Sequence, residues 1–91
     1  ITCREEGRRE KLVPYLEQQG IQTRMLFAGN LLRHPCFDEM RAEGTAYRVA
    51  GTLENTDRIM RDTFWIGVYP GMTDEMLDEM ADQIHQGLRI N

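Results

Sequence analysis

Three segments of the chain carry the side-chain pattern of β-strands. Residues 1–4 alternate between apolar and polar side chains, residues 21–27 form a second strand-like run, and residues 63–69 are rich in aromatic and β-branched side chains. Each segment is followed within a few residues by a turn sequence that contains glycine. The pattern therefore predicts three strands.

Residues 8–19 have apolar side chains at helical spacing, and Gly20 stands where a C-terminal cap belongs. Proline lacks the backbone donor that a helix interior needs, so Pro14 predicts that this helix begins near Lys11 or kinks there. The apolar positions on one side of the predicted helix are Leu12, Val13, Tyr15 and Leu16.

Two further helices are expected in the second half of the chain. One begins at a cap formed by Asn55 or Thr56 and ends at about Arg61, with Asp57 in its first turn. The other is capped by Thr73 and carries two acidic residues in its first turn. Its apolar stripe, interpreted as core, is Met76, Leu77, Met80, Ile84 and Leu88, whereas His85 is expected to face solvent.

The order of these elements is strand, helix, strand, loop, helix, strand, helix. It predicts a two-layer α+β domain of three strands with helices packed on one face. Residues 41–52 contain two glycines and are expected to form an exposed loop. The chain has 91 residues, which suits one domain or a piece of one.

Charge and composition exclude several classes of function. The net charge of -4 lacks the basic footprint of a nucleic-acid-binding protein, and there is no run of about 18 apolar residues for a membrane span. The two cysteines, Cys3 and Cys36, have no metal-binding spacing and suit a reducing cytoplasm. The chain begins on a strand-like run without Met, which we interpret as a cut inside a longer protein.

The candidate binding chemistry is concentrated in residues 23–37, where a predicted strand gives way to a loop. Arg24 and Arg33 could hold a diphosphate with their planar guanidinium groups, and Asn30 and His34 add polar contacts. The alternative is an ordinary loop with exposed charges. His34 has no carboxylate partner in the neighbouring sequence, which is typical of a surface histidine.

A second cluster, Asn55-Thr56-Asp57-Arg58, has two possible interpretations. It forms either a helix cap and a solvated turn, or it directs Arg58 toward a ligand phosphate or sugar. The chain lacks a phosphate-binding glycine loop and a Ser/His/Asp grouping, and its single lysine, Lys11, is predicted to lie on an exposed helix face. We therefore expect no catalytic residue and no metal ligand in this chain.

Several motifs together resemble one enzyme family. The sequence GIQTR at 20–24, Asn30, the His-Pro pair at 34–35 and PGMTDE at 70–75 resemble the small domain of the DegT/DnrJ/EryC1/StrS sugar aminotransferase superfamily. Most members have a Tyr followed by Pro-Leu-His in the central strand, where residues 24–31 here read RMLFAGNL. That version, with NTDRIM at 55–60 and TFWIGVYPG at 63–71, resembles the branch of CDP-4-keto-6-deoxyglucose 3-dehydrases.

The resemblance implies that residues 1–91 are the C-terminal small domain of a fold-type-I enzyme whose large domain binds pyridoxamine 5'-phosphate and a 2Fe-2S cluster. Such an enzyme removes the C3 hydroxyl of a CDP-4-keto-6-deoxy sugar in the 3,6-dideoxyhexose branch of lipopolysaccharide biosynthesis. The cofactor acts as the electron sink, and an NADH-dependent iron–sulfur reductase supplies electrons. The resemblance also implies a homodimer and an inactive isolated fragment.

Within that framework the expected substrate contacts are Arg58 first, then Asn30 and Arg24, then Arg33 and His34. Two alternatives stay open: the small domain of a sugar-nucleotide aminotransferase that uses pyridoxal phosphate, and an independent α+β binding module. A fragment is also expected to expose the apolar surface that normally meets the large domain, so it should self-associate or show an apolar patch. The candidates for this surface are Leu31, Leu32 and Phe37.

Overall fold

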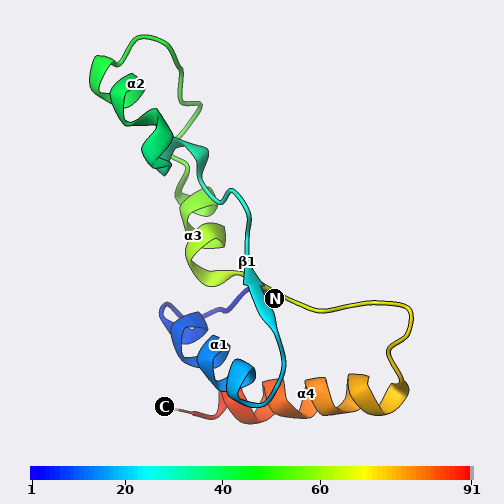
Figure 1. Cartoon of the computed structure of the whole chain (residues 1–91). Helices are drawn as coiled ribbons and strands as arrows, with labels where there is room; N and C mark the ends of the chain where they lie inside the picture. The colour runs from blue at the N-terminus through cyan, green and yellow to red at the C-terminus, as the bar shows by residue number, and fades with distance from the viewer. Residues whose placement is uncertain (91) are drawn as a thin grey trace.

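The molecule is elongated, with one helical pair at its base and a narrow extension above it (Figure 1). The computed structural model describes residues 1–90 and measures 53 × 32 × 21 Å along its principal axes. In this range the elements are α1 (Arg8–Gln18), β1 (Thr23–Met25), η1 (Leu31–Arg33), η2 (Pro35–Phe37), α2 (Asp38–Glu43), α3 (Glu54–Asp62), β2 (Phe64–Ile66) and α4 (Asp74–Leu88). The mixture confirms the α+β class.

The helix α1 begins at Arg8, so the expected start near Lys11 is wrong, and Pro14 lies inside the helix. Its C-terminal end follows the prediction. Gly20 has a φ of 83°, and its N–H donates to the Glu17 carbonyl at 3.1 Å. The N–H of Ile21 donates to the Leu16 carbonyl at 3.0 Å, which completes a Schellman motif with both apolar side chains buried together.

The sheet has two antiparallel strands within residues 1–90, where the sequence predicted three. The strands β1 and β2 pair Thr23 with Ile66 and Met25 with Phe64. The first predicted strand, at 1–4, makes only an isolated bridge between Thr2 and Thr63. The chain bends away at Arg4, so this segment adds the Cys3 N–H bond to the Asp62 carbonyl (2.9 Å) without extending into a ladder.

Both named strands are three residues long and therefore shorter than predicted. Before β1, the N–H of Ile21 bonds to the last turn of α1 and therefore does not join the sheet. The backbone N–H and the hydroxyl of Thr23 both donate to a Glu17 carboxylate oxygen at 2.7 Å. After β2 the backbone leaves the sheet, and Val68 is 82% exposed. With a single neighbouring strand, neither segment has a partner that could prolong its ladder.

One small core holds the base of the molecule together. The helices α1 and α4 pack against each other beside the sheet, with α4 running along the bottom of Figure 1. The five buried hydrophobic residues are Cys3, Leu12, Leu16, Ile21 and Phe64, and Met80 and Ile84 of α4 pack on them. The remainder of the predicted α4 stripe, Met76, Leu77 and Leu88, is 41–48% exposed.

The ends of α3 and α4 are stabilised in different ways. Thr73 caps α4 as predicted, because its side chain accepts a hydrogen bond from the Met76 N–H at 3.2 Å. The predicted cap of α3 at Asn55 or Thr56 is wrong, since that helix begins at Glu54 after Leu53 in a left-handed conformation (φ 58°). None of the helices described in residues 1–90 is long and apolar enough to cross a bilayer.

Residues 31–53 form the outer part of the extension, beyond α3 in Figure 1, and we call this part the arm. It contains η1, η2 and α2, so the predicted loop at 41–52 is helical over its first three residues. No residue of the arm is buried. Of the three candidates for the expected apolar surface, Leu31 is 59% exposed, whereas Leu32 and Phe37 are half-buried. Apolar surface is also exposed beside the sheet, where Phe27 (85% exposed) stacks on Trp65.

Candidate functional site

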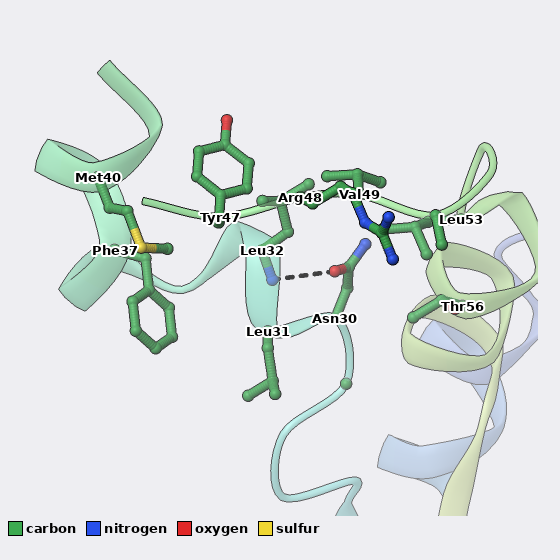
Figure 2. A pocket seen from close by; sticks show the side chains of 12 residues that line it. Asn30, Leu31, Leu32, Phe37, Met40, Tyr47, Arg48, Val49, Leu53 and Thr56 are labelled. Atoms are coloured by element: carbon green, nitrogen blue, oxygen red, sulfur yellow. Dashed lines mark hydrogen bonds between the residues drawn. The ribbon is translucent and has the colours of Figure 1, made fainter. Parts of the chain in front are cut away.

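A groove of about 460 Å³ lies where the arm meets α3. Its walls are largely apolar, and Asn30 and Arg48 provide polar groups that point toward the same part of the groove (Figure 2). An apolar cavity of this size with few polar groups is typical of a small-molecule site. The lining residues are Gly29, Asn30, Leu31, Leu32, Phe37, Met40, Tyr47, Arg48, Val49, Ala50, Leu53 and Thr56.

Asn30 is a buried side chain at the centre of this region, with 3% of its surface exposed. Its side-chain oxygen accepts from the Leu32 N–H at 3.1 Å and caps η1, as the dashed line in Figure 2 shows. Its Nδ2 donates to Asp57 Oδ1 at 2.7 Å. Asn30 therefore connects the start of the arm to α3 by hydrogen bonds within the chain.

Arg33 approaches the same carboxylate from the arm. Its Nε and Nη2 donate to the two oxygens of Asp57, both at 2.7 Å, in a bidentate pair. The Arg33 guanidinium, followed by the Asn30 amide, holds the pKa of Asp57 well below its usual range, and the same pair raises the pKa of Arg33. Asp57 thus carries a negative charge that orients two of the predicted site residues.

The other three predicted site residues lie apart from that network. His34 is half-buried, and its Nε2 contacts the carbonyl oxygen of Ala28. The Arg58 side chain is 53% exposed and has its Nε 3.9 Å from an oxygen of Asp62. Arg24 is exposed on β1 opposite Trp65. Of the five predicted site residues, Asn30 alone is among those that line the groove.

Sequence reasoning missed three residues that shape this region. Arg48 lies in the segment predicted as an exposed loop, but its side chain lines the groove. The sequence predicts Asp57 in the first turn of a helix and gives it no role in the site, although its carboxylate accepts hydrogen bonds from Asn30 and Arg33. Arg9 donates to the Met60 carbonyl at 2.6 Å and the Thr63 carbonyl at 3.2 Å, where the end of α3 leaves carbonyl groups without helical partners. These contacts join residues 24 to 54 positions apart, which no local pattern signals.

The described side chains do not fit a cofactor that needs a lysine anchor or a thiolate set. Lys11, the single lysine, is exposed on α1. Burial raises the pKa of the Cys3 thiol, and Cys36 is exposed elsewhere. Among residues 1–90, no three His, Cys, Asp or Glu side chains come together in a way that could hold a metal ion.

Comparison with known protein families assigns the chain. The model of the DegT/DnrJ/EryC1/StrS aminotransferase family matches residues 1–85. The chain belongs to this family. The family resemblance carried by the motifs at 20–24, 34–35 and 70–75 is thereby confirmed.

Two relatives show which members of the family the chain resembles in sequence. The chain is 46% identical over 93 residues to the lipopolysaccharide biosynthesis protein RfbH of Salmonella typhimurium, and the match covers all of this chain and 20% of that protein. It is 47% identical over 76 residues to a dTDP-4-dehydro-2,6-dideoxy-D-glucose 3-dehydratase of Saccharopolyspora spinosa, covering 84% of this chain and 15% of that protein. The chain spans a fifth or less of the length of these relatives.

Proposed function

We propose that this chain is the C-terminal small domain of a nucleotide-sugar 3-dehydratase that serves dideoxysugar synthesis. The observation that carries the proposal is the sequence identity of 46% and 47% to two relatives. One is named as a lipopolysaccharide biosynthesis protein and the other as a sugar 3-dehydratase. This identity, over all of the chain in one case and 84% of it in the other, supports the dehydratase branch of the family, as do the motifs at 24–31 and 55–60.

The finer proposal concerns the substrate and the cofactors. We take the substrate to be a CDP-4-keto-6-deoxy sugar that loses its C3 hydroxyl, and the cofactors to be pyridoxamine 5'-phosphate and a 2Fe-2S cluster. The exposed Lys11 and the separated Cys3 and Cys36 support the view that other parts of the enzyme bind both groups. The proposed partners are the large domain, a second subunit of a homodimer and an NADH-dependent iron–sulfur reductase, all in the cytoplasm.

The role we propose for this chain is to cover and position the substrate. The arm supports this role, because it has no buried residue of its own yet presents an apolar groove. A segment without a core is held in place more firmly when a second surface packs against it. The apolar side chains of Leu31 and Phe37 suit such a contact with the large domain.

The proposed substrate contacts remain Arg58, Asn30, Arg24, Arg33 and His34. Arg58 and Arg24 support this assignment best, because both are exposed and neither donates a hydrogen bond to another residue described in 1–90. Arg33 would act with Nη1, since its Nε and Nη2 are bonded to Asp57. Asn30 would act with the remaining hydrogen of Nδ2, since Oδ1 accepts from Leu32 and Nδ2 already donates to Asp57. His34 would contact the substrate only after its Nε2 releases the carbonyl oxygen of Ala28.

A sugar-nucleotide aminotransferase is the second candidate, because the family that matches residues 1–85 is described as an aminotransferase family. The two candidates differ at the cofactor position of the large domain. The test is to read the gene that encodes this chain in full and to record the absorption spectrum of the purified product. Histidine at the cofactor-lysine position with iron–sulfur absorption supports the dehydratase, whereas lysine with an internal aldimine band and no iron supports the aminotransferase.

A further inference from the structure

We propose that Arg9, Arg33 and Arg61 form a binding site for the diphosphate of a nucleoside diphosphate. These side chains line a hollow of about 360 Å³ together with Asp57 and Met60. The hollow is distinct from the apolar groove, and two of its three arginines were not among the residues expected to touch a ligand. The nucleoside as the source of the diphosphate rests on the proposed function, whereas the anion site rests on the geometry alone.

The charge in the hollow favours an anion. Three guanidinium groups and one carboxylate line the hollow, which is an excess of positive charge among the lining side chains; the carboxylates of Glu6 and Asp62 lie beside Arg61 but are not in the lining. Positive groups gathered in a concave surface raise the local concentration of anions. The bidentate pair of Arg33 with Asp57 is neutral overall, so the excess of positive charge in the lining comes from Arg9 and Arg61.

Two of the arginines are held in position while part of each guanidinium stays free. Arg33 uses Nε and Nη2 on Asp57, which leaves Nη1 without an acceptor among residues 1–90. Arg9 uses Nη1 on the carbonyls of Met60 and Thr63, which leaves Nε and Nη2. A guanidinium fixed along one edge can donate from the other at little further cost in side-chain entropy.

Arg61 is the arginine with the most unused donors. No hydrogen bond joins it to another residue of the described chain, and its Nε lies 3.5 Å from Asp62 Oδ1 and 3.9 Å from Glu6 Oε1. Its side chain is 45% exposed. Turning toward a ligand in the hollow would break no hydrogen bond within residues 1–90, but it would exchange the ion pairs with Asp62 and Glu6 for contacts with the ligand.

A diphosphate matches these donors better than a single carboxylate does. Its oxygens are spread over two phosphorus centres, so it can accept bidentate hydrogen bonds from more than one guanidinium. The donors come from three separate elements, namely α1, η1 and α3, which surround the hollow instead of lying along a strip. That arrangement suits a compact anion.

The experiment is an NMR titration of the isotope-labelled 91-residue chain with inorganic pyrophosphate and, separately, with cytidine diphosphate. We expect the arginine Nε–H signals of Arg9 and Arg33 to shift, and Arg61→Gln to weaken binding about tenfold, as the loss of a charge-assisted hydrogen bond implies. The matched control is Arg89→Gln, an exposed arginine near the C-terminal end of α4, which should change affinity by less than about twofold. Amide spectra check that each variant is folded, and Arg61→Lys replaces Arg61→Gln if that variant is not.

Equal weakening by Arg61→Gln and Arg89→Gln, or shifts spread over the surface, would overturn the site, because general charge attraction would then explain the binding. Localised pyrophosphate binding supports the anion site. Tighter binding of cytidine diphosphate than of pyrophosphate supports the nucleoside diphosphate as its ligand, and equal binding overturns that part. None of these readouts measures dehydration, so they can fail or succeed independently of the proposed activity.

Discussion

Asp57 is the residue on which two of the expected substrate contacts depend. It accepts hydrogen bonds from Asn30 and Arg33 at 2.7 Å, and it sits in the first turn of α3, where a negative charge is also favoured by the helix dipole. The residue types of Asn30 and Arg33 suggested a polar site from sequence. Their common partner lies 24 to 27 positions away, so only the folded chain reveals it.

The first prediction concerns the ionisation of Asp57. Because its pKa is lowered in the folded chain, the carboxyl group should remain ionised when the pH falls through the ordinary value of 3.8. Folding stability from this pair is therefore fully present above that value and is lost as the pH falls toward the lower folded pKa. A carboxyl-carbon NMR titration should show Asp57 titrating below its usual range, and Arg33→Met should raise its pKa.

Arg89→Met serves as the control for that titration, because Arg89 is exposed and lies at the other end of the chain. It should leave the Asp57 titration where it is in the unsubstituted chain. A midpoint for Asp57 that is unchanged by Arg33→Met would show that the bidentate pair does not form in solution.

At the scale of elements, the sequence predicted the existence of most helices and strands better than their ends. The Thr73 cap and the Gly20 termination of α1 were predictable because both depend on residues next to them in the sequence. The start of α3 was not, since Leu53 adopts a left-handed conformation that its residue type does not favour. The predicted strand lengths were also wrong, because the length of a strand depends on a neighbouring strand, and residues 1–4 form only an isolated bridge.

The second prediction tests the packing of α1 on α4. Gly87 is buried at this contact, and a Cβ added there would lie 2.5 Å from Leu12 Cδ1 and 2.7 Å from Tyr15 Cδ1. Overpacking of this kind costs about 1–3 kcal/mol, while alanine regains up to about 1 kcal/mol of helix propensity. Gly87→Ala should therefore lower the free energy of unfolding by about 1–2 kcal/mol in a urea titration.

Gly67→Ala is the matched control, because nothing lies within 4 Å of a Cβ built at that position. Its free energy of unfolding should stay within about 0.5 kcal/mol of the unsubstituted chain. If Gly87→Ala proved as stable as this control, the close approach of α1 and α4 would be wrong.

For the whole molecule, the distribution of burial explains what sequence patterns could and could not predict. The core of Leu12, Leu16 and Phe64 follows from periodicity, and so does the α+β class. The exposure of the arm at 31–53 does not follow from the sequence. Apolar residues are as frequent there as in a segment that packs in a core, yet none of them is buried. The two relatives are five or more times as long as this chain, in accord with the proposal that a large domain packs on the arm.

The most direct test of the central claim is to identify the product that the full-length protein makes from a CDP-4-keto-6-deoxy sugar. The protein would be supplied with pyridoxamine 5'-phosphate, NADH and an iron–sulfur reductase, and the sugar nucleotide would be analysed by mass spectrometry. A dehydratase gives a product that lacks the C3 oxygen. A product that keeps this oxygen and carries a new amino group would contradict the dehydratase assignment and make the protein a sugar aminotransferase of the same family.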